Sequence, residues 1–108
     1  FFKKLGTDIV SHNVHWGPYG AGQQTTRGMQ SYLKGVSFGF HTFGLLWTPE
    51  TYSFYIDGLK FYEVSSGVSQ IPEYLILSME IPSVLADISK TVFPDVFSVD
   101  YVKVYQKK

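Results

Sequence analysis

The sequence contains no cysteine and no long apolar run, and its formal charges cancel. Without cysteine there is neither a disulfide framework nor a thiolate metal site. No apolar stretch approaches the roughly 20 residues that a membrane-spanning helix needs. Nine Lys and Arg balance nine Asp and Glu, so the basic face that favours nucleic acid or an anionic membrane is not indicated. We therefore expect neither nucleic acid nor a membrane span.

Aromatic side chains are what this chain has in excess. Its 108 residues include nine Phe, eight Tyr and two Trp. Aromatic residues suit pleated, half-buried surfaces, so the simpler interpretation is an all-β core. The alternative is a cleft in which flat rings stack on sugars. Both interpretations stay open at this point.

An alternating pattern of period two dominates the chain and predicts strands. Between Thr7 and Trp16 one face would carry Ile9, Ser11, Asn13 and His15, and the other Val10, His12, Val14 and Trp16. Each face mixes polar and apolar groups, as in a strand between a core and a wet groove. The glycine-rich stretch Gly17–Ser31 predicts a long loop.

The strongest local signal is a β-hairpin. Asp57-Gly58 separates the strand-like runs Thr51–Ile56 and Leu59–Val64, and this pair supplies the positive φ angles of a type I′ turn. Further strands are predicted at Gly39–Thr48, Tyr74–Ile81 and Val96–Gln106, with one short helical turn around Val84–Ile88. Several short strands separated by turns favour an antiparallel sandwich or barrel, formed as one unit over residues 1–108.

The residues alone do not identify a reaction. Glycoside hydrolysis needs two carboxylates facing one bond. On a strand, acids share a face at positions i, i+2 and i+4, or at i+5 with a bulge, and no three of the nine acids have this spacing. These acids are Asp8, Glu50, Asp57, Glu63, Glu73, Glu80, Asp87, Asp95 and Asp100. His12 and His15 are three apart on a predicted strand and face opposite ways, so they do not form a metal site. No G-x-S-x-G elbow is present.

Three segments, taken in order, resemble glycoside hydrolase family 16, of the laminarinase or endo-β-1,3(4)-glucanase type. F-H-T-F-G-L-L-W-T-P at Phe40–Pro49 runs into F-Y-I-D-G at Phe54–Gly58. Y-L-I-L-S-M-E at Tyr74–Glu80 resembles a late strand of that family. D-Y-V-K-V-Y-Q at Asp100–Gln106 resembles its closing strand.

The resemblance implies the C-terminal half of a concanavalin-like jelly roll, an antiparallel β-sandwich that is incomplete here. Family members are retaining endo-hydrolases of β-linked glycans, with their glutamates on an E-x-D-x-x-E or E-x-D-x-E strand. That strand is expected just upstream of Phe1, and this chain lacks it. A non-catalytic carbohydrate-binding module and a purely structural sandwich remain alternatives.

The resemblance also implies site residues and partners. His15 and Trp16 would bind substrate, with His15 favoured because alternation places the two on opposite faces. Asp100 would be a ligand of a structural Ca²⁺, and the chemistry would require no cofactor. The expected partners are a polysaccharide or oligosaccharide and the N-terminal half of the domain. The expected role is carbohydrate metabolism, and the expected location is secreted, periplasmic or at the cell surface.

Overall fold

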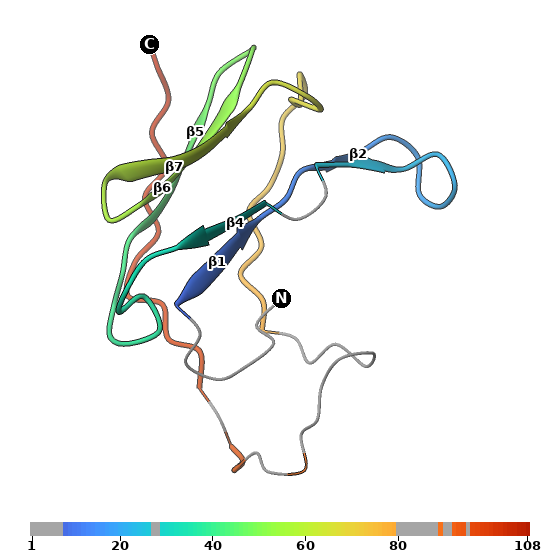
Figure 1. The fold of residues 1–108 in the computed structure, drawn as a ribbon. Coiled ribbons are helices and arrows are strands. Elements are labelled where there is room, and N and C mark those ends of the chain that lie inside the picture. Colours follow the sequence, from blue (N-terminus) through green and yellow to red (C-terminus); the bar gives the residue numbers. More distant parts are fainter. Residues whose placement is uncertain (1–7, 27–28, 80–88, 90–91, 95) are drawn as a thin grey trace. The chain divides into compact units, whose positions relative to one another are not determined.

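The computed structural model describes residues 8–26, 29–79, 89, 92–94 and 96–108. The chain divides into two compact units, Phe1–Tyr74 and Leu75–Lys108. Every regular element in these described ranges is a strand, and all strand pairs are antiparallel (Figure 1). The predicted all-β class is thus confirmed. The helical turn predicted at Val84–Ile88 lies outside the described residues. Among the described residues, no helix is long and apolar enough to cross a bilayer.

The predicted hairpin is the centre of a three-stranded sheet in the first unit. Strand β6 (Tyr52–Ile56) pairs with β7 (Leu59–Val64) on one side and with β5 (Phe43–Trp47) on the other. Asp57 and Gly58 have φ angles of 49° and 80°. These left-handed values are what a two-residue type I′ loop requires. The Asp-Gly signal therefore sets the register of β6 against β7 at the turn, where Ile56 faces Leu59 and Tyr55 faces Lys60.

A β-bulge interrupts the ladder between β6 and β7. Tyr55 faces Lys60 and Phe54 faces Tyr62, which leaves Phe61 as an extra residue on β7. A bulge of this kind resets which residues share a face. Because of it, Tyr62 lies on the same face as Phe54, and the two rings stack with centroids 5.9 Å apart.

The remaining strands form two antiparallel pairs. Strand β1 (Ile9–His12) pairs with β4 (Met29–Tyr32), and β2 (His15–Trp16) pairs with β3 (Gln24–Thr25). The long loop predicted over Gly17–Ser31 is therefore wrong, since it contains β3 and the first part of β4. Glycine and polar residues have low β propensity, but pairing with a neighbouring strand decides the conformation.

The core of the first unit lies where β1 meets the three-stranded sheet. His12 is only 5% exposed, and its ring centroid lies 5.1 Å from that of Phe54 and 6.2 Å from that of Tyr62. The His12 Nε2 atom is 3.0 Å from the Ser31 hydroxyl on β4. Ile56 is fully buried. Burial lowers the pKa of His12, so this histidine is a neutral, hydrogen-bonded part of the core. The contact joins two antiparallel layers, as in a β-sandwich.

The apolar side chains of β5 remain exposed. Phe43, Leu45, Leu46 and Trp47 are between 41% and 62% exposed, although β5 pairs along one edge with β6. A sandwich normally buries one face of each sheet against the other. Exposed apolar residues on an edge strand agree with the expectation of an incomplete jelly roll.

The second unit differs from the sequence-based expectation. The sequence predicts strands at Tyr74–Ile81 and Val96–Gln106, yet residues 74–79 and 96–106 form no strand. These two predictions are wrong for the residues that the structure describes. An alternating pattern favours a strand only where a neighbouring strand completes its backbone hydrogen bonds.

Candidate functional site

The segment of β1 and β2 has an inward and an outward side. Val14 is buried and Trp16 half-buried, whereas Asn13 and His15 are exposed. Buried and exposed side chains keep alternating between the end of β1 and the start of β2, because the backbone of Val14 remains hydrogen-bonded to Thr26. The Val14 N–H donates to the Thr26 hydroxyl and its carbonyl accepts from the Thr26 N–H, both at 3.1 Å. Two surfaces on this segment are therefore candidates for a site.

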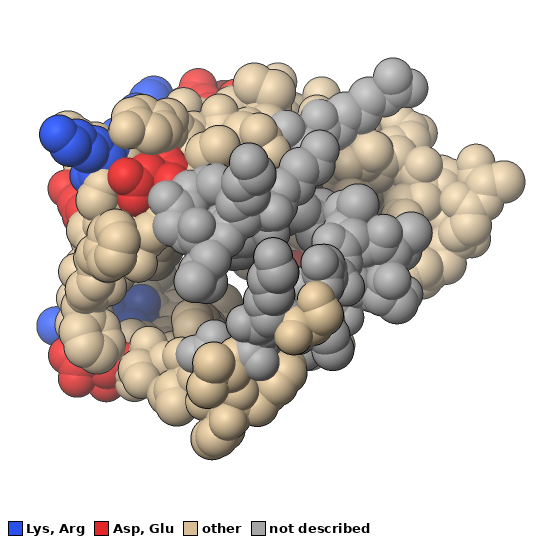
Figure 2. Space-filling view, turned by 60° about the horizontal axis from the view of Figure 1, so that its bottom comes forward, with Lys and Arg blue, Asp and Glu red and all other residues tan. Residues whose placement is uncertain are grey.

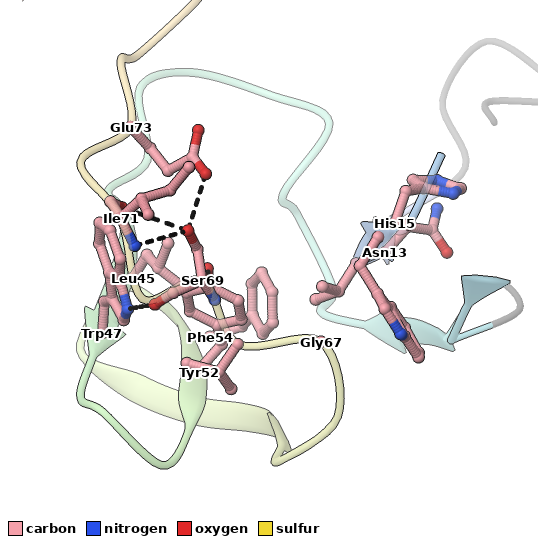
Figure 3. A pocket seen from close by; sticks show the side chains of 14 residues that line it. Asn13, His15, Leu45, Trp47, Tyr52, Phe54, Gly67, Ser69, Ile71 and Glu73 are labelled. Carbon is pink, nitrogen blue, oxygen red and sulfur yellow. Dashed lines mark hydrogen bonds between the residues drawn. The ribbon is translucent and has the colours of Figure 1, made fainter. Parts of the chain in front are cut away.

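The inward side opens into a pocket of about 750 Å³. Many of its lining residues are apolar or aromatic, namely Val14, Trp16, Leu45, Trp47, Tyr52, Phe54, Val68 and Ile71, and polar side chains of Asn13, His15, Ser69 and Glu73 also line it (Figure 3). The Trp47 indole N–H donates to the Ser69 carbonyl at 3.1 Å, which fixes one wall. An aromatic lining with a few polar side chains at its edge is typical of a ligand pocket.

Glu73 is the acidic residue of the pocket lining, and the Ser69 hydroxyl lies 2.8 Å from its carboxylate. No second carboxylate is present among the lining residues. Hydrolysis of a glycosidic bond uses a pair of carboxyl groups about 5–10 Å apart. The pocket residues alone therefore cannot carry that reaction.

Trp16 packs against Gly67 at one edge of the pocket. A Cβ atom at Gly67 would overlap the indole ring, and Gly67 has a φ of 69° that favours glycine in any case. No local pattern predicts this contact, because 51 positions separate the two residues. Gly67 is thus needed for the position of the Trp16 ring.

The outward side is polar. Strand register places Ser11 opposite Gln30, Ile9 opposite Tyr32 and His15 opposite Thr25, and alternation adds Asn13. Residues directly opposite in an antiparallel pair share a face. Figure 3 shows the side chains of Asn13 and His15 turned away from Leu45 and Trp47. We call this set the polar face; its members are Ile9, Ser11, Asn13, His15, Thr25, Gln30 and Tyr32.

None of these side chains is Lys, Arg, Asp or Glu. On the surface seen in Figure 2, positive and negative side chains of the described residues are mixed, without an extended region of one sign. Hydroxyl, amide and imidazole groups can both donate and accept hydrogen bonds. The polar face therefore offers partners for a neutral polyhydroxylated ligand, with a tyrosine ring at one end.

The structure places both predicted site residues at the pocket. The half-buried Trp16 packs on Gly67, whereas His15 is exposed at the rim, where the polar face begins, in agreement with the opposite sides expected from alternation. Whether either residue binds substrate stays a prediction. Sequence reasoning did not assign Gln30 and Tyr32 to a site, because it placed most of this stretch in a loop.

A second polar cluster, which sequence reasoning missed, joins His41 to Asp57. The His41 Nδ1 atom lies 2.6 Å from an Asp57 carboxylate oxygen, and its Nε2 lies 2.7 Å from the Phe38 carbonyl and 3.1 Å from the Gly35 carbonyl. The other Asp57 oxygen accepts from the Thr42 N–H at 3.0 Å.

Both ring nitrogens of His41 thus face oxygen acceptors, and only the protonated ring can donate from both. The hydrogen bond to Asp57, followed by that to the Phe38 carbonyl, raises the pKa of His41. The same bond, followed by that from the Thr42 N–H, lowers the pKa of Asp57. The His41–Asp57 pair connects the β6–β7 turn to the loop that contains Gly35 and Phe38, so its role is structural.

Asp100 is exposed and belongs to the second unit. The described residues contain no group of three or more His, Cys, Asp or Glu that could hold a metal ion. Calcium takes six to eight oxygen ligands. Calcium binding at Asp100 stays a prediction.

The sequence of this chain is similar to that of known glycan hydrolases. The model of the glycosyl hydrolases family 16 matches residues 2–103. The chain belongs to this family. A β-glucanase of Acetivibrio thermocellus is 28% identical over 79 residues, which are 69% of this chain and 22% of that protein. The chain thus spans about a fifth of the length of the curated relative that it matches. No solved structure matches the chain.

Family membership confirms the resemblance seen in the sequence motifs and agrees with an antiparallel sandwich of the jelly-roll type.

Proposed function

We propose that this chain contributes a glycan-binding wall to a retaining, endo-acting hydrolase of β-linked glucan or a similar polysaccharide. On this proposal residues 1–108 are the C-terminal part of one sandwich domain. The catalytic glutamates stand on a strand outside this sequence, just before residue 1, in a segment that completes the domain. The enzyme acts outside the cytoplasm, on extracellular polysaccharide.

One observation carries the proposal: the polar face presents only uncharged groups on the outward side of β1, β2, β3 and β4. It lies opposite the buried side occupied by His12 and Val14. A glycan chain has hydroxyl groups along its length and needs a row of such partners. His15 contributes the imidazole of the row, whose two nitrogens can donate and accept hydrogen bonds, so it can bind a sugar hydroxyl or contact a neighbouring carboxylate.

A second candidate function is a non-catalytic carbohydrate-binding module on the same scaffold. The absence of an E-x-D-x-x-E or E-x-D-x-E segment from this sequence favours this second function, because these segments carry the catalytic glutamates in the family. Both functions use the polar face, and they differ in whether bonds are cleaved when the upstream segment is present.

The test measures binding and hydrolysis separately. The 108-residue chain is titrated with laminarin and lichenan oligosaccharides by calorimetry, and release of reducing ends is assayed in parallel. We expect binding without turnover and about tenfold weaker binding for His15→Ala, corresponding to about 1.4 kcal/mol. Glu50→Ala, at an exposed turn position, is the matched control and leaves binding unchanged.

The hydrolase proposal is then tested with the upstream segment fused to the chain. Release of reducing ends, with a first product that keeps its anomeric configuration, supports a retaining hydrolase. Binding without cleavage by the fusion supports the binding module instead. Absence of glycan binding in every form refutes both candidates.

A further inference from the structure

One wall of the inward pocket is held in place by a single residue, Ser69. Its N–H donates to the Tyr52 hydroxyl oxygen at 3.0 Å, and its carbonyl accepts from the Trp47 indole N–H at 3.1 Å. The Ser69 hydroxyl donates to a Glu73 carboxylate oxygen at 2.8 Å. Figure 3 shows Trp47, Ser69 and Glu73 joined by these bonds. The same residue therefore positions two aromatic rings and a carboxylate.

The segment that carries Ser69 and Glu73 is itself fixed to the sheet. The Gln70 amide donates to the Pro49 carbonyl at 2.9 Å, in the turn between β5 and β6. The Ile71 N–H donates to the Ser69 hydroxyl at 3.3 Å. A wall that is ordered in advance loses less freedom when a ligand binds. The wall is thus preorganised for binding.

Trp47 and Tyr52 form an aromatic corner in this wall. They lie directly opposite each other on β5 and β6, with ring centroids 5.9 Å apart and an angle of 52° between the ring planes. Trp47 is 41% exposed, although its N–H is bonded to Ser69. Because that donor is occupied, a ligand in the pocket meets the ring itself. The faces of aromatic rings carry partial negative charge and attract cations.

Glu73 adds a negative group of the same sign beside the rings. A carboxylate has about four acceptor sites, so the bond from Ser69 leaves Glu73 able to bind a ligand. A positively charged ligand is attracted by the carboxylate and by the ring faces together, whereas a neutral ligand gains only apolar contact. The pocket volume of about 750 Å³ is in the usual range for small-molecule sites.

We propose that this pocket is a binding site for a small organic ammonium ion. The cation lies against the Trp47 and Tyr52 rings, and Glu73 balances its charge. The site goes beyond the proposed glycan function, because it takes a different class of ligand and uses residues outside the polar face.

The experiment is a calorimetric titration of the 108-residue chain with choline. The comparison ligand is the neutral alcohol of the same shape, in which a carbon atom replaces the choline nitrogen. We expect choline to bind with a dissociation constant in the millimolar range, as for a ligand with few atoms. The neutral alcohol should bind at least about fivefold more weakly. Added salt should weaken only the binding of choline, because salt screens the attraction to Glu73.

Variants assign the binding to residues. Glu73→Gln, at an exposed position, keeps an oxygen that can accept from Ser69 but removes the charge. It should weaken choline binding about two- to fivefold and leave binding of the neutral alcohol unchanged. Glu50→Gln removes another exposed carboxylate, outside the described pocket lining, and is the matched control with unchanged affinity. Trp47→Leu keeps an apolar side chain without a ring and should weaken choline binding about two- to fivefold more than binding of the alcohol.

Equal affinities for choline and the neutral alcohol would overturn the proposal, because the pocket would then recognise shape without charge. Absence of choline binding through the millimolar range would overturn it as well. Equal effects of Glu73→Gln and Glu50→Gln would remove Glu73 from the site. If Trp47→Leu does not fold, the comparison of the two ligands and the exposed Glu73→Gln variant still decide the outcome.

Discussion

Replacing Gly67 with alanine tests the packing that holds Trp16 in place. The new Cβ atom would overlap the indole ring, so the ring or the backbone has to move. A left-handed conformation also costs a residue with a Cβ about 1–2 kcal/mol. If the half-buried ring loses roughly 100 Å² of contact, at about 25 cal/mol per Å², the additional cost is about 2.5 kcal/mol.

Gly39→Ala is the matched control for the energetic cost of placing a Cβ atom on a residue with a left-handed backbone conformation. Gly39 has a φ of 74°, close to the 69° of Gly67, but nothing lies within 4 Å of its Cβ position. The control should lose about 1–2 kcal/mol of unfolding free energy. Gly67→Ala should lose about 2.5 kcal/mol more, so the difference between the two variants isolates the displacement of Trp16.

Urea denaturation followed by tryptophan fluorescence measures both effects. The chain has two tryptophans, so Trp47→Phe in all samples leaves Trp16 as the reporter. With a slope of about 1–3 kcal/mol per molar urea, Gly67→Ala should lower the midpoint about 1–2 M below that of the control. Its native emission should shift to longer wavelength. Equal midpoints and unshifted emission would show that Trp16 does not pack on Gly67.

Two further predictions concern polar pairs. The raised pKa of His41 and the lowered pKa of Asp57 mean that their bond stabilises the fold at intermediate pH. This contribution fades as pH falls below about 4, through the folded pKa of the aspartate, and as pH rises above about 6.5, through that of the histidine. In Asp57→Asn, which tolerates the positive φ, thermal melts should show a smaller change of Tm between pH 6 and 9; an unaltered pH profile would contradict the pairing. Ser31→Ala leaves the buried His12 Nε2 without its partner and should cost about 1–3 kcal/mol in chemical denaturation, whereas Ser65→Ala, at an exposed position, should cost less than about 0.5 kcal/mol.

Local signals in the sequence predicted local structure well. Asp57-Gly58 defined the hairpin because a type I′ turn depends on the residues within it. Alternation placed His12 and His15 on opposite sides because side chains of a strand alternate whatever its partner. The family motif from Phe40 to Pro49 led to the correct family.

Pairing between distant segments was not predictable in the same way. The Gly17–Ser31 stretch has weak strand propensity, yet β3 and β4 form there because β2 and β1 supply hydrogen-bonding partners. Conversely, the regular pattern of Val96–Gln106 predicted a strand that the structure does not have. The position of Tyr32 on the polar face could not be predicted either, because it depends on the pairing of Tyr32 with Ile9 on a distant strand.

The bulge at Phe61 affects how this chain should be compared with its relatives. On a regular hairpin, Leu59, Phe61 and Glu63 would share a face, but here Tyr62 takes the place next to Leu59 on the side of Ile56. A relative with an unbulged hairpin would therefore align only with a gap of one residue between Lys60 and Tyr62. An ungapped alignment would compare inward-facing residues with outward-facing ones along the rest of β7, so substitutions there should be interpreted only after that gap has been placed.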